Sequence, residues 1–114
     1  MLDTTPLLTA VDRFADRLRS APQSRLQQGA AAEGLALARE LALRAQRIEE
    51  PGGEPRVMPD AGVFAVADQV AVAGHDLAEI LRTTADNADM AAAPSRELDE
   101  AVELVAAAAA RATL

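Results

Sequence analysis

The chain has 114 residues, which suits a single domain (1–114) with one hydrophobic core, and half of its residues are hydrophobic. Only 2% of the residues are aromatic. The chain contains no cysteine, which excludes a disulfide framework and a thiolate metal site. The net charge of −7, reached without any lysine, argues against a nucleic-acid partner, because a phosphate backbone requires a basic surface. The excess acid lies in the second half: residues 1–50 carry seven Arg and seven acidic residues, whereas residues 51–114 carry four Arg and eleven acidic residues.

A first helix is predicted over residues 5–19. Thr4 or Thr5 followed by Pro6 is typical of a helix start, with a hydroxyl N-cap and a proline whose missing N–H costs nothing at the first helical position. Apolar residues then recur at intervals of three and four, which places them on one side of a helix. These residues are Leu7, Leu8, Val11, Phe14, Ala15 and Leu18.

A second, longer helix is predicted over residues 22–50, again beginning at a proline, Pro22. Only Gly29 and Gly34 interrupt the helical pattern, each at a cost of about 1 kcal/mol relative to alanine, and we expect a bend near Gly29. The predicted buried side consists of Leu26, Ala30, Gly34, Leu37, Ala38, Leu41, Ala45 and Ile48.

A second apolar stripe lies on the same helix, outside its predicted buried side. It comprises Ala32, Leu35, Ala36, Arg39 and Leu43. Such a stripe is either tolerated surface, since scattered exposed leucines are common, or a seam between copies of the chain. We take these five residues as the candidate partner-binding residues.

A Pro/Gly-rich linker at 51–59 separates two predicted helical hairpins. The third helix is expected at 60–83, capped by Asp60, and as the most apolar segment it should be the central helix of the fold. Gly74 falls on its buried side and should mark a close crossing with a neighbouring helix. Charged residues along this segment argue against a membrane span. Its buried side is predicted to consist of Val63, Val66, Val70, Ala73, Leu77 and Ile80.

Residues 83–93 are predicted to form a loop, with Asp86, Asn87 and Asp89 as turn formers. A fourth helix, 94–112, should start at Pro94. Its first turn carries several carboxylates, which favour the positive end of the helix dipole, and these are Glu97, Asp99 and Glu100. The predicted inner face consists of Leu98, Val102, Val105 and Ala109.

Together these segments predict an all-α fold, an antiparallel four-helix bundle in up-down-up-down order, because each amphipathic helix must bury its apolar side against neighbours. A bundle completed by a second copy of the chain is the alternative that the length leaves open.

The only histidine, His75, lies on the polar side of the third helix with Asp68, Glu79 and Arg82, so we expect it to be exposed. The simplest interpretation is a surface histidine paired with Glu79, one turn further on.

The string Gly74-His75-Asp76-Leu77 resembles the start of the phosphoacceptor box in dimeric histidine-kinase bundles. This resemblance implies phosphotransfer at His75 as the alternative function, because a neutral imidazole that solvent can reach can attack an aspartyl phosphate. The chain departs from the pattern at Ala78 and Glu79, where those families usually carry a basic residue.

No other catalytic pattern is evident. The chain lacks the paired Glu-x-x-His motifs of di-metal bundles, a Gly-rich phosphate loop, a nucleophile elbow and an HExxH string. We therefore expect no catalytic residue, no metal and no cofactor. The N-terminal sequence Met1-Leu2-Asp3 does not resemble a signal peptide, so we expect a cytoplasmic protein. The sequence predicts a small, non-enzymatic helical interaction module that binds a protein partner or a second copy of itself.

Overall fold

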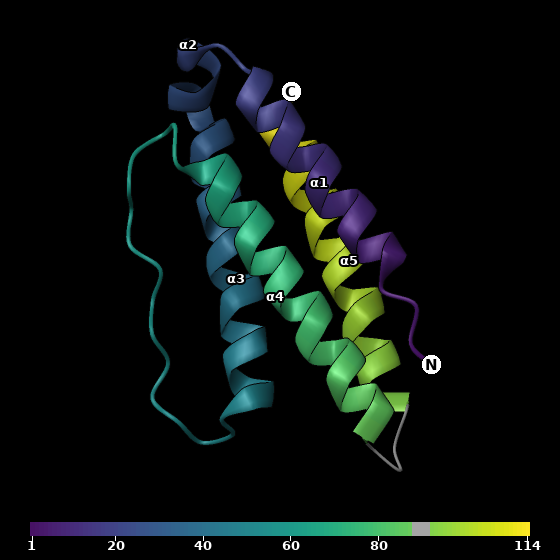
Figure 1. The fold of residues 1–114 in the computed structure, drawn as a ribbon. Coiled ribbons are helices and arrows are strands. Elements are labelled where there is room, and N and C mark those ends of the chain that lie inside the picture. Colours follow the sequence, from purple (N-terminus) through teal and green to yellow (C-terminus); the bar gives the residue numbers. More distant parts are fainter. Residues whose placement is uncertain (88–91) are drawn as a thin grey trace.

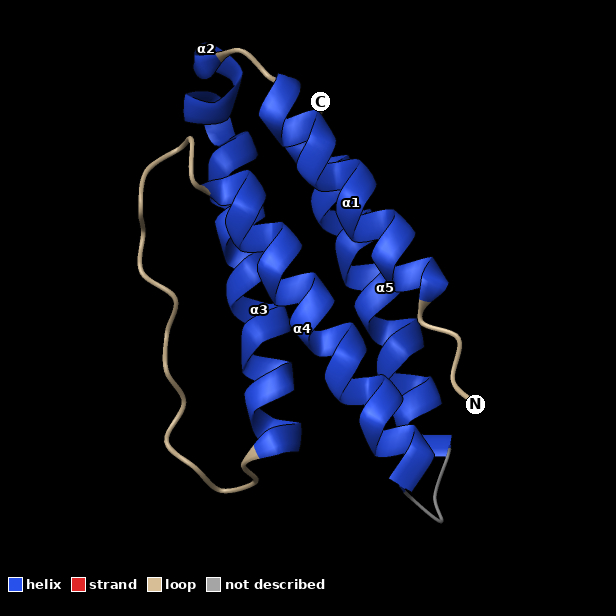
Figure 2. Cartoon of the chain, viewed as in Figure 1, coloured by secondary structure: helices blue, strands red, loops and turns tan. Residues whose placement is uncertain are grey.

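The computed structural model of the chain describes residues 1–87 and 92–114, and every regular element in them is a helix (Figures 1 and 2). The elements are α1 (Thr5–Ser20), α2 (Gln23–Arg25), η1 (Leu26–Ala30), α3 (Ala31–Glu49), α4 (Val66–Asn87) and α5 (Ala92–Ala112). Because α2 and η1 are short turns leading into α3, four long helices make up the packed body of these residues. The prediction of an all-α four-helix fold is confirmed.

The direction of α4 differs from the predicted alternation. Gly34, early in α3, lies against Val66 at the start of α4, and Ala45, late in α3, lines the same hollow as Ile80, late in α4. These two helices are therefore parallel, while α1 and α5 run the opposite way (Figure 1). The order is up-down-down-up, so the up-down-up-down part of the prediction is wrong for the last two long helices, α4 and α5.

The length of the connection between α3 and α4 explains this direction. It spans residues 50–65 and returns along the whole of α3 before α4 begins (Figure 1). α3 has 19 residues and is about 28 Å long at about 1.5 Å per residue, whereas sixteen extended residues reach about 53 Å. The predicted linker, 51–59, was too short because Asp60 does not cap a helix. Its carboxylate instead accepts a hydrogen bond from the Gly62 N–H, at 2.9 Å, and Gly62 has a φ of 94°.

α4 makes the most extensive packing contacts of the four long helices, in agreement with its prediction as the central helix. It packs against α3, α1 and α5, whereas α1 and α3 make few direct contacts with each other. None of the helices in the described residues is long and apolar enough to cross a membrane. The residues that α4 buries are Val66, Ala67, Val70, Ala73, Gly74, Leu77, Ala78 and Leu81.

Most of the predicted core residues are buried, including five of the six predicted in α1. The exceptions lie at the edges of the predicted apolar sides and are only half-buried: Leu8, Ile48, Val63, Ile80, Val102 and Ala109. On the Ala-rich α5 the buried residues include small ones that the sequence did not single out, namely Ala101, Ala108 and Ala112.

Two glycines allow helices to approach closely. A Cβ on Gly74 would lie 2.5 Å from Val11 Cγ2 and 2.6 Å from Val11 Cγ1, so α1 and α4 cross where this side chain is missing. The predicted close crossing at Gly74 is confirmed. Gly34 plays the same part between α3 and α4, where a Cβ would lie 2.5 Å from Val66 Cγ1.

The predicted bend near Gly29 is also confirmed. Gly29 has φ 143° and ψ −20° within η1, whereas the flanking residues Arg25 and Ala31 are helical. A φ in this range is rarely adopted by any residue with a side chain. The short segment of α2 and η1 therefore joins α3 at an angle.

The start of α1 is stabilised by Asp3 rather than by a threonine. Thr4 occupies the N-cap position but makes no side-chain capping hydrogen bond, and Pro6 lies in the first turn. The Thr5 N–H instead donates to Asp3 Oδ1 at 3.0 Å. Hydrogen bonds with Thr5, first that of its side chain and then that of its backbone N–H, lower the pKa of Asp3 below its ordinary value.

Both ends of the predicted loop at 83–93 are helical in the structure. α4 continues to Asn87, so Asp86 and Asn87 are helical, and α5 already begins at Ala92, ahead of Pro94. Asp86 lies 3.8 Å from Arg82, one turn earlier, which supports the longer helix. Asp89 lies outside the described residues.

Carboxylates near the start of α5 join this helix to α3. Arg44 of α3 lies 2.8 Å from Glu100 and 3.1 Å from Glu97, and it also pairs with Glu40 one turn earlier on its own helix, at 3.0 Å. The hydrogen bond that Arg44 donates to Glu100 is the largest of the causes that raise the pKa of Arg44 above its ordinary value. Glu97 and Glu100 therefore pair with Arg44, and the dipole of α5 alone does not account for them.

Candidate functional site

A groove runs between η1, the first half of α3 and the residues that lead into α4. We call it the α3 groove. Its volume is about 410 Å³. Its lining is mostly apolar and consists of Leu26, Gln27, Ala31, Ala32, Leu35, Ala36, Arg39, Asp60, Gly62, Val63 and Val66. Four of the five predicted partner-binding residues are therefore found in one concave surface.

The groove arises from local features of the chain. The bend at Gly29 separates Leu26 and Gln27 from the axis of α3, and the turn at Gly62 brings Val63 to the opposite wall. At the base, Leu35 is 9% exposed and belongs to the core, so the prediction that it lies outside the buried side of its helix is wrong. Ala32 and Ala36 are exposed, as predicted. Because alanine side chains are small, they leave the space of the groove open.

Arg39 ties the connection 50–65 to α3 at the edge of the groove. Its Nε donates to the Met58 carbonyl oxygen at 2.8 Å. No carboxylate within residues 1–87 and 92–114 lies at ion-pair distance from its guanidinium group. The other charged residue of the lining, Asp60, accepts the hydrogen bond from Gly62. One cation and one anion thus leave the lining of the groove without net charge.

Leu43, the fifth predicted partner-binding residue, does not reach the α3 groove. It lines a separate hollow of about 160 Å³ beneath Gly52, Gly53 and Pro55. There Gln46 holds the connection in place, because its Nε2 donates to the Arg56 carbonyl oxygen and its Oε1 accepts from the Arg56 N–H. The same chain therefore partly covers Leu43.

Exposed apolar side chains stand near this region. Phe64, which directly follows the groove residue Val63, is 72% exposed, and Val57 on the connection is 73% exposed. Phe14, the other aromatic residue, is buried. Sequence reasoning did not identify Phe64 as a surface residue. The available signal was its position one residue away from the predicted buried side of the third helix.

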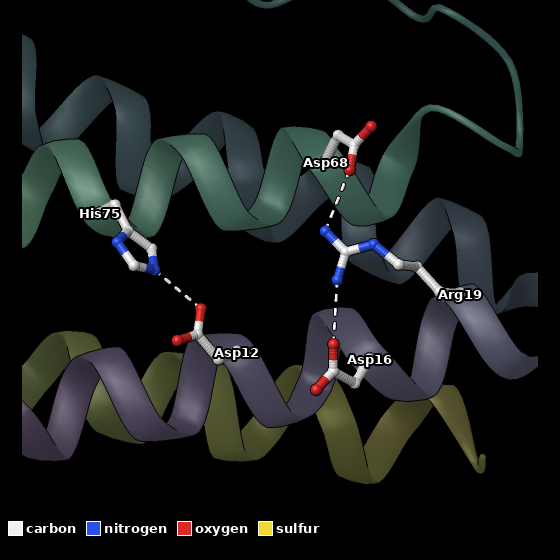
Figure 3. A network of polar contacts seen from close by, with 5 residues as sticks. All are labelled: Asp12, Asp16, Arg19, Asp68 and His75. Atoms are coloured by element: carbon white, nitrogen blue, oxygen red, sulfur yellow. Dashed lines mark hydrogen bonds and ion pairs between the residues drawn. The ribbon is translucent and has the colours of Figure 1, made fainter.

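His75 is exposed, as predicted, but its partner is not Glu79. Its Nε2 lies 2.7 Å from Asp12 Oδ1 of α1, and half of its side chain is exposed (Figure 3). Glu79 pairs with Arg82 instead, at 2.6 Å. A polar side chain at the edge of the α1–α4 contact therefore pairs across the two helices, which the sequence of a single helix could not indicate.

A second contact of the same kind lies two turns away. Arg19 of α1 donates to Asp68 of α4 and to Asp16, each at 3.0 Å (Figure 3). The hydrogen bond to Asp68 is the largest cause of the raised pKa of the Arg19 guanidinium. All these groups are exposed, so they are best explained as ion pairs that align α1 with α4.

In the part of the chain that the structure describes, no group of three or more His, Cys, Asp or Glu side chains could hold a metal ion. The same residues include no buried charged or polar side chain of the kind that often marks a catalytic site. No family model, no curated protein and no solved structure matches the chain.

Proposed function

We propose that this protein is a non-enzymatic helical interaction module that self-associates through the α3 groove. The observation that carries the proposal is the coincidence of an apolar stripe, selected from the sequence, with a concave surface of about 410 Å³. Surfaces of this kind, with exposed apolar residues beside them, are typical of protein interaction sites.

The chemistry of the lining favours binding over catalysis. Arg39 and Asp60 are its only charged residues, and Asp60 already accepts a hydrogen bond from the backbone. A general acid or base normally needs a pKa close to the working pH, and a nucleophile needs a neighbouring base. The lining offers neither arrangement, whereas alanine and leucine side chains are suited to contact with another apolar surface.

The charge distribution favours a second copy of the chain as the partner. Residues 51–114 hold the whole excess of seven negative charges, and α4 and α5 belong to this half. Two copies that met through these helices would repel each other. The α3 groove is uncharged overall and mostly lined by the first half of the chain, so two copies can meet there at the lowest electrostatic cost.

Sedimentation velocity tests this proposal through one substitution in the groove. We expect the wild-type protein to dimerise as its concentration rises. Ala36→Glu should be monomeric, because it places a charge on the exposed floor of an apolar surface. Ala107→Glu is the matched control, since it adds the same charge at an exposed alanine of α5 and should dimerise like the wild type. A wild-type protein that stays monomeric at every concentration would contradict the proposal.

Phosphotransfer at His75 is a second candidate, and the half-exposed imidazole in the middle of α4 favours it. The surroundings oppose it, because Asp12 lies beside Nε2 and further acidic residues, Asp76 and Glu79, are exposed on the same helix. Incubation with phosphorylated response regulators would give an acid-labile label that His75→Gln removes. Absence of label in the wild type would exclude this candidate.

A further inference from the structure

Phe64 is the only aromatic residue that is exposed on the surface of the described chain. It lies in the turn that precedes α4, in which the Ala65 N–H donates to the Gly62 carbonyl oxygen at 3.1 Å. With 72% of its surface exposed, its ring does not fill the groove of its own chain. Aromatic side chains of this kind are enriched at protein interfaces, where they act as anchors.

We propose that Phe64 of a second copy is the group that occupies the α3 groove, so that two copies exchange their phenyl rings reciprocally. This inference rests on the proposed function and names the side chain that carries it. The groove has sufficient room, since apolar cavities of about 150 Å³ can hold benzene and this one measures about 410 Å³.

The position of Phe64 fits a two-fold symmetric pair. Phe64 is covalently next to Val63, a wall residue of the groove, so the backbone that carries the exposed ring lies beside the concave surface. In a two-fold interface each copy contributes the same patch, and a projection beside a groove complements its own rotated copy. Arg39 and Asp60 also belong to this patch, so each copy brings one cation and one anion to the contact.

The available surface is large enough for such a contact. A stable dimer buries about 800 Å² on each partner. This area is about one eighth of the 6544 Å² of accessible surface of the chain. The broad side of the molecule, whose principal extents are 48 and 28 Å, is larger than this area. The exposed Val57, on the connection beside α3, would add apolar area at the edge of the contact.

The first arm of the test measures the dimer dissociation constant by sedimentation. Phe64→Ala should raise this constant about tenfold or more, as expected for an interface anchor. Val72→Ala is the matched control, because Val72 is an exposed apolar residue of α4 outside the groove lining, and it should leave the constant unchanged. Phe64→Ala should not alter the unfolding transition of the monomer, since the ring is exposed.

The second arm maps the contact by disulfide formation. The natural chain has no cysteine, so Phe64→Cys in one copy and Ala36→Cys in a differently tagged copy are unique thiols. In the mixed dimer the other contact keeps its Phe64 and an unaltered groove. We expect a disulfide-linked heterodimer from this pair, and much less from Phe64→Cys mixed with Ala107→Cys.

The outcomes separate this inference from the function on which it rests. A wild-type dimer that Ala36→Glu dissociates, but that Phe64→Ala leaves intact and the 64–36 pair does not cross-link, would overturn the inference and retain the groove as the interface. A monomeric wild-type protein would overturn both. Loss of the dimer with Phe64→Ala, together with the 64–36 cross-link, would support both.

Discussion

Gly74 restricts how α1 and α4 pack against each other, because the two helices approach closely at this residue. A Cβ at this position would lie between 2.5 and 3.0 Å from three atoms of Val11. Valine is branched at Cβ and is held in one rotamer on a helix, so it cannot turn aside. The two helices must therefore move apart if Gly74 acquires a side chain.

We predict that Gly74→Ala destabilises the protein by about 1–2 kcal/mol. Alanine improves helix propensity by about 1 kcal/mol, but overpacking of a tight core costs about 1–3 kcal/mol and strain in both helices adds to it. Denaturant unfolding of a double-mutant cycle with Val11→Ala provides the control, because Gly74→Ala should cost much less once Val11 is shortened. An additive cycle would show that this contact does not limit the packing.

Helical periodicity predicted the buried side of each helix well, because burial on one side leaves a direct pattern of apolar residues in the sequence. It identified Val66, Val70 and Leu77, and it also identified Gly74 as a close crossing. It could not identify the partner of His75, since Asp12 lies on another helix, 63 residues away. Exposed polar contacts between helices leave no such pattern.

At the scale of elements, the bend at Gly29 shapes one end of the α3 groove. Leu26 and Gln27 precede the bend and Ala31 follows it, and all three line the groove. Glycine is required at position 29 because of its φ of 143°. Steric crowding is not the reason, since a Cβ there would meet nothing within 4 Å.

We predict that Gly29→Ala destabilises the protein by about 1–2 kcal/mol, because a side chain at this φ is strained. The sign of the change in the free energy of unfolding is informative, since a glycine-to-alanine substitution in a regular helix would stabilise the protein by about 1 kcal/mol. Chemical denaturation measures this difference. The dimer should also weaken, because Leu26 and Gln27 would move relative to α3. A stabilised variant would mean that the segment is a continuous helix in solution.

The direction of α4 shows what the sequence could not supply. Pro51, Gly52 and Gly53 mark the end of the second helix clearly, but the end of the connection depends on the turn at Asp60 and Gly62. An amphipathic helix buries the same side whether it runs up or down, so its periodicity carries no direction. Only the length of a connection restricts direction, and the predicted connection, 51–59, was seven residues shorter than the observed one, 50–65, which changed the predicted topology. The four predicted partner-binding residues that line the groove were selected by periodicity alone, so the error in topology did not affect their selection.

At the scale of the whole molecule, the proposed dimer must overcome the repulsion between two chains of charge −7 each. Two such charges about 30 Å apart repel by about 7 kcal/mol in unscreened water. At a Debye length of about 30 Å roughly a third of this energy remains, whereas at about 8 Å, the value at physiological salt, only a few per cent remains. The apolar contact at the groove is affected much less by salt over this range.

We therefore predict that the dimer becomes tighter by about tenfold or more between low and physiological ionic strength, because about 2 kcal/mol of repulsion is screened. Sedimentation equilibrium at a series of sodium chloride concentrations measures the change. The Ala36→Glu variant is the control and should remain monomeric at every salt concentration. Its apolar contact is disrupted, so screening of the repulsion between the two chains is not enough to let it dimerise. A dimer that weakens as salt is added would instead be held by pairing between opposite charges, and the α3 groove, with its single Arg39 and single Asp60, would then be the wrong interface.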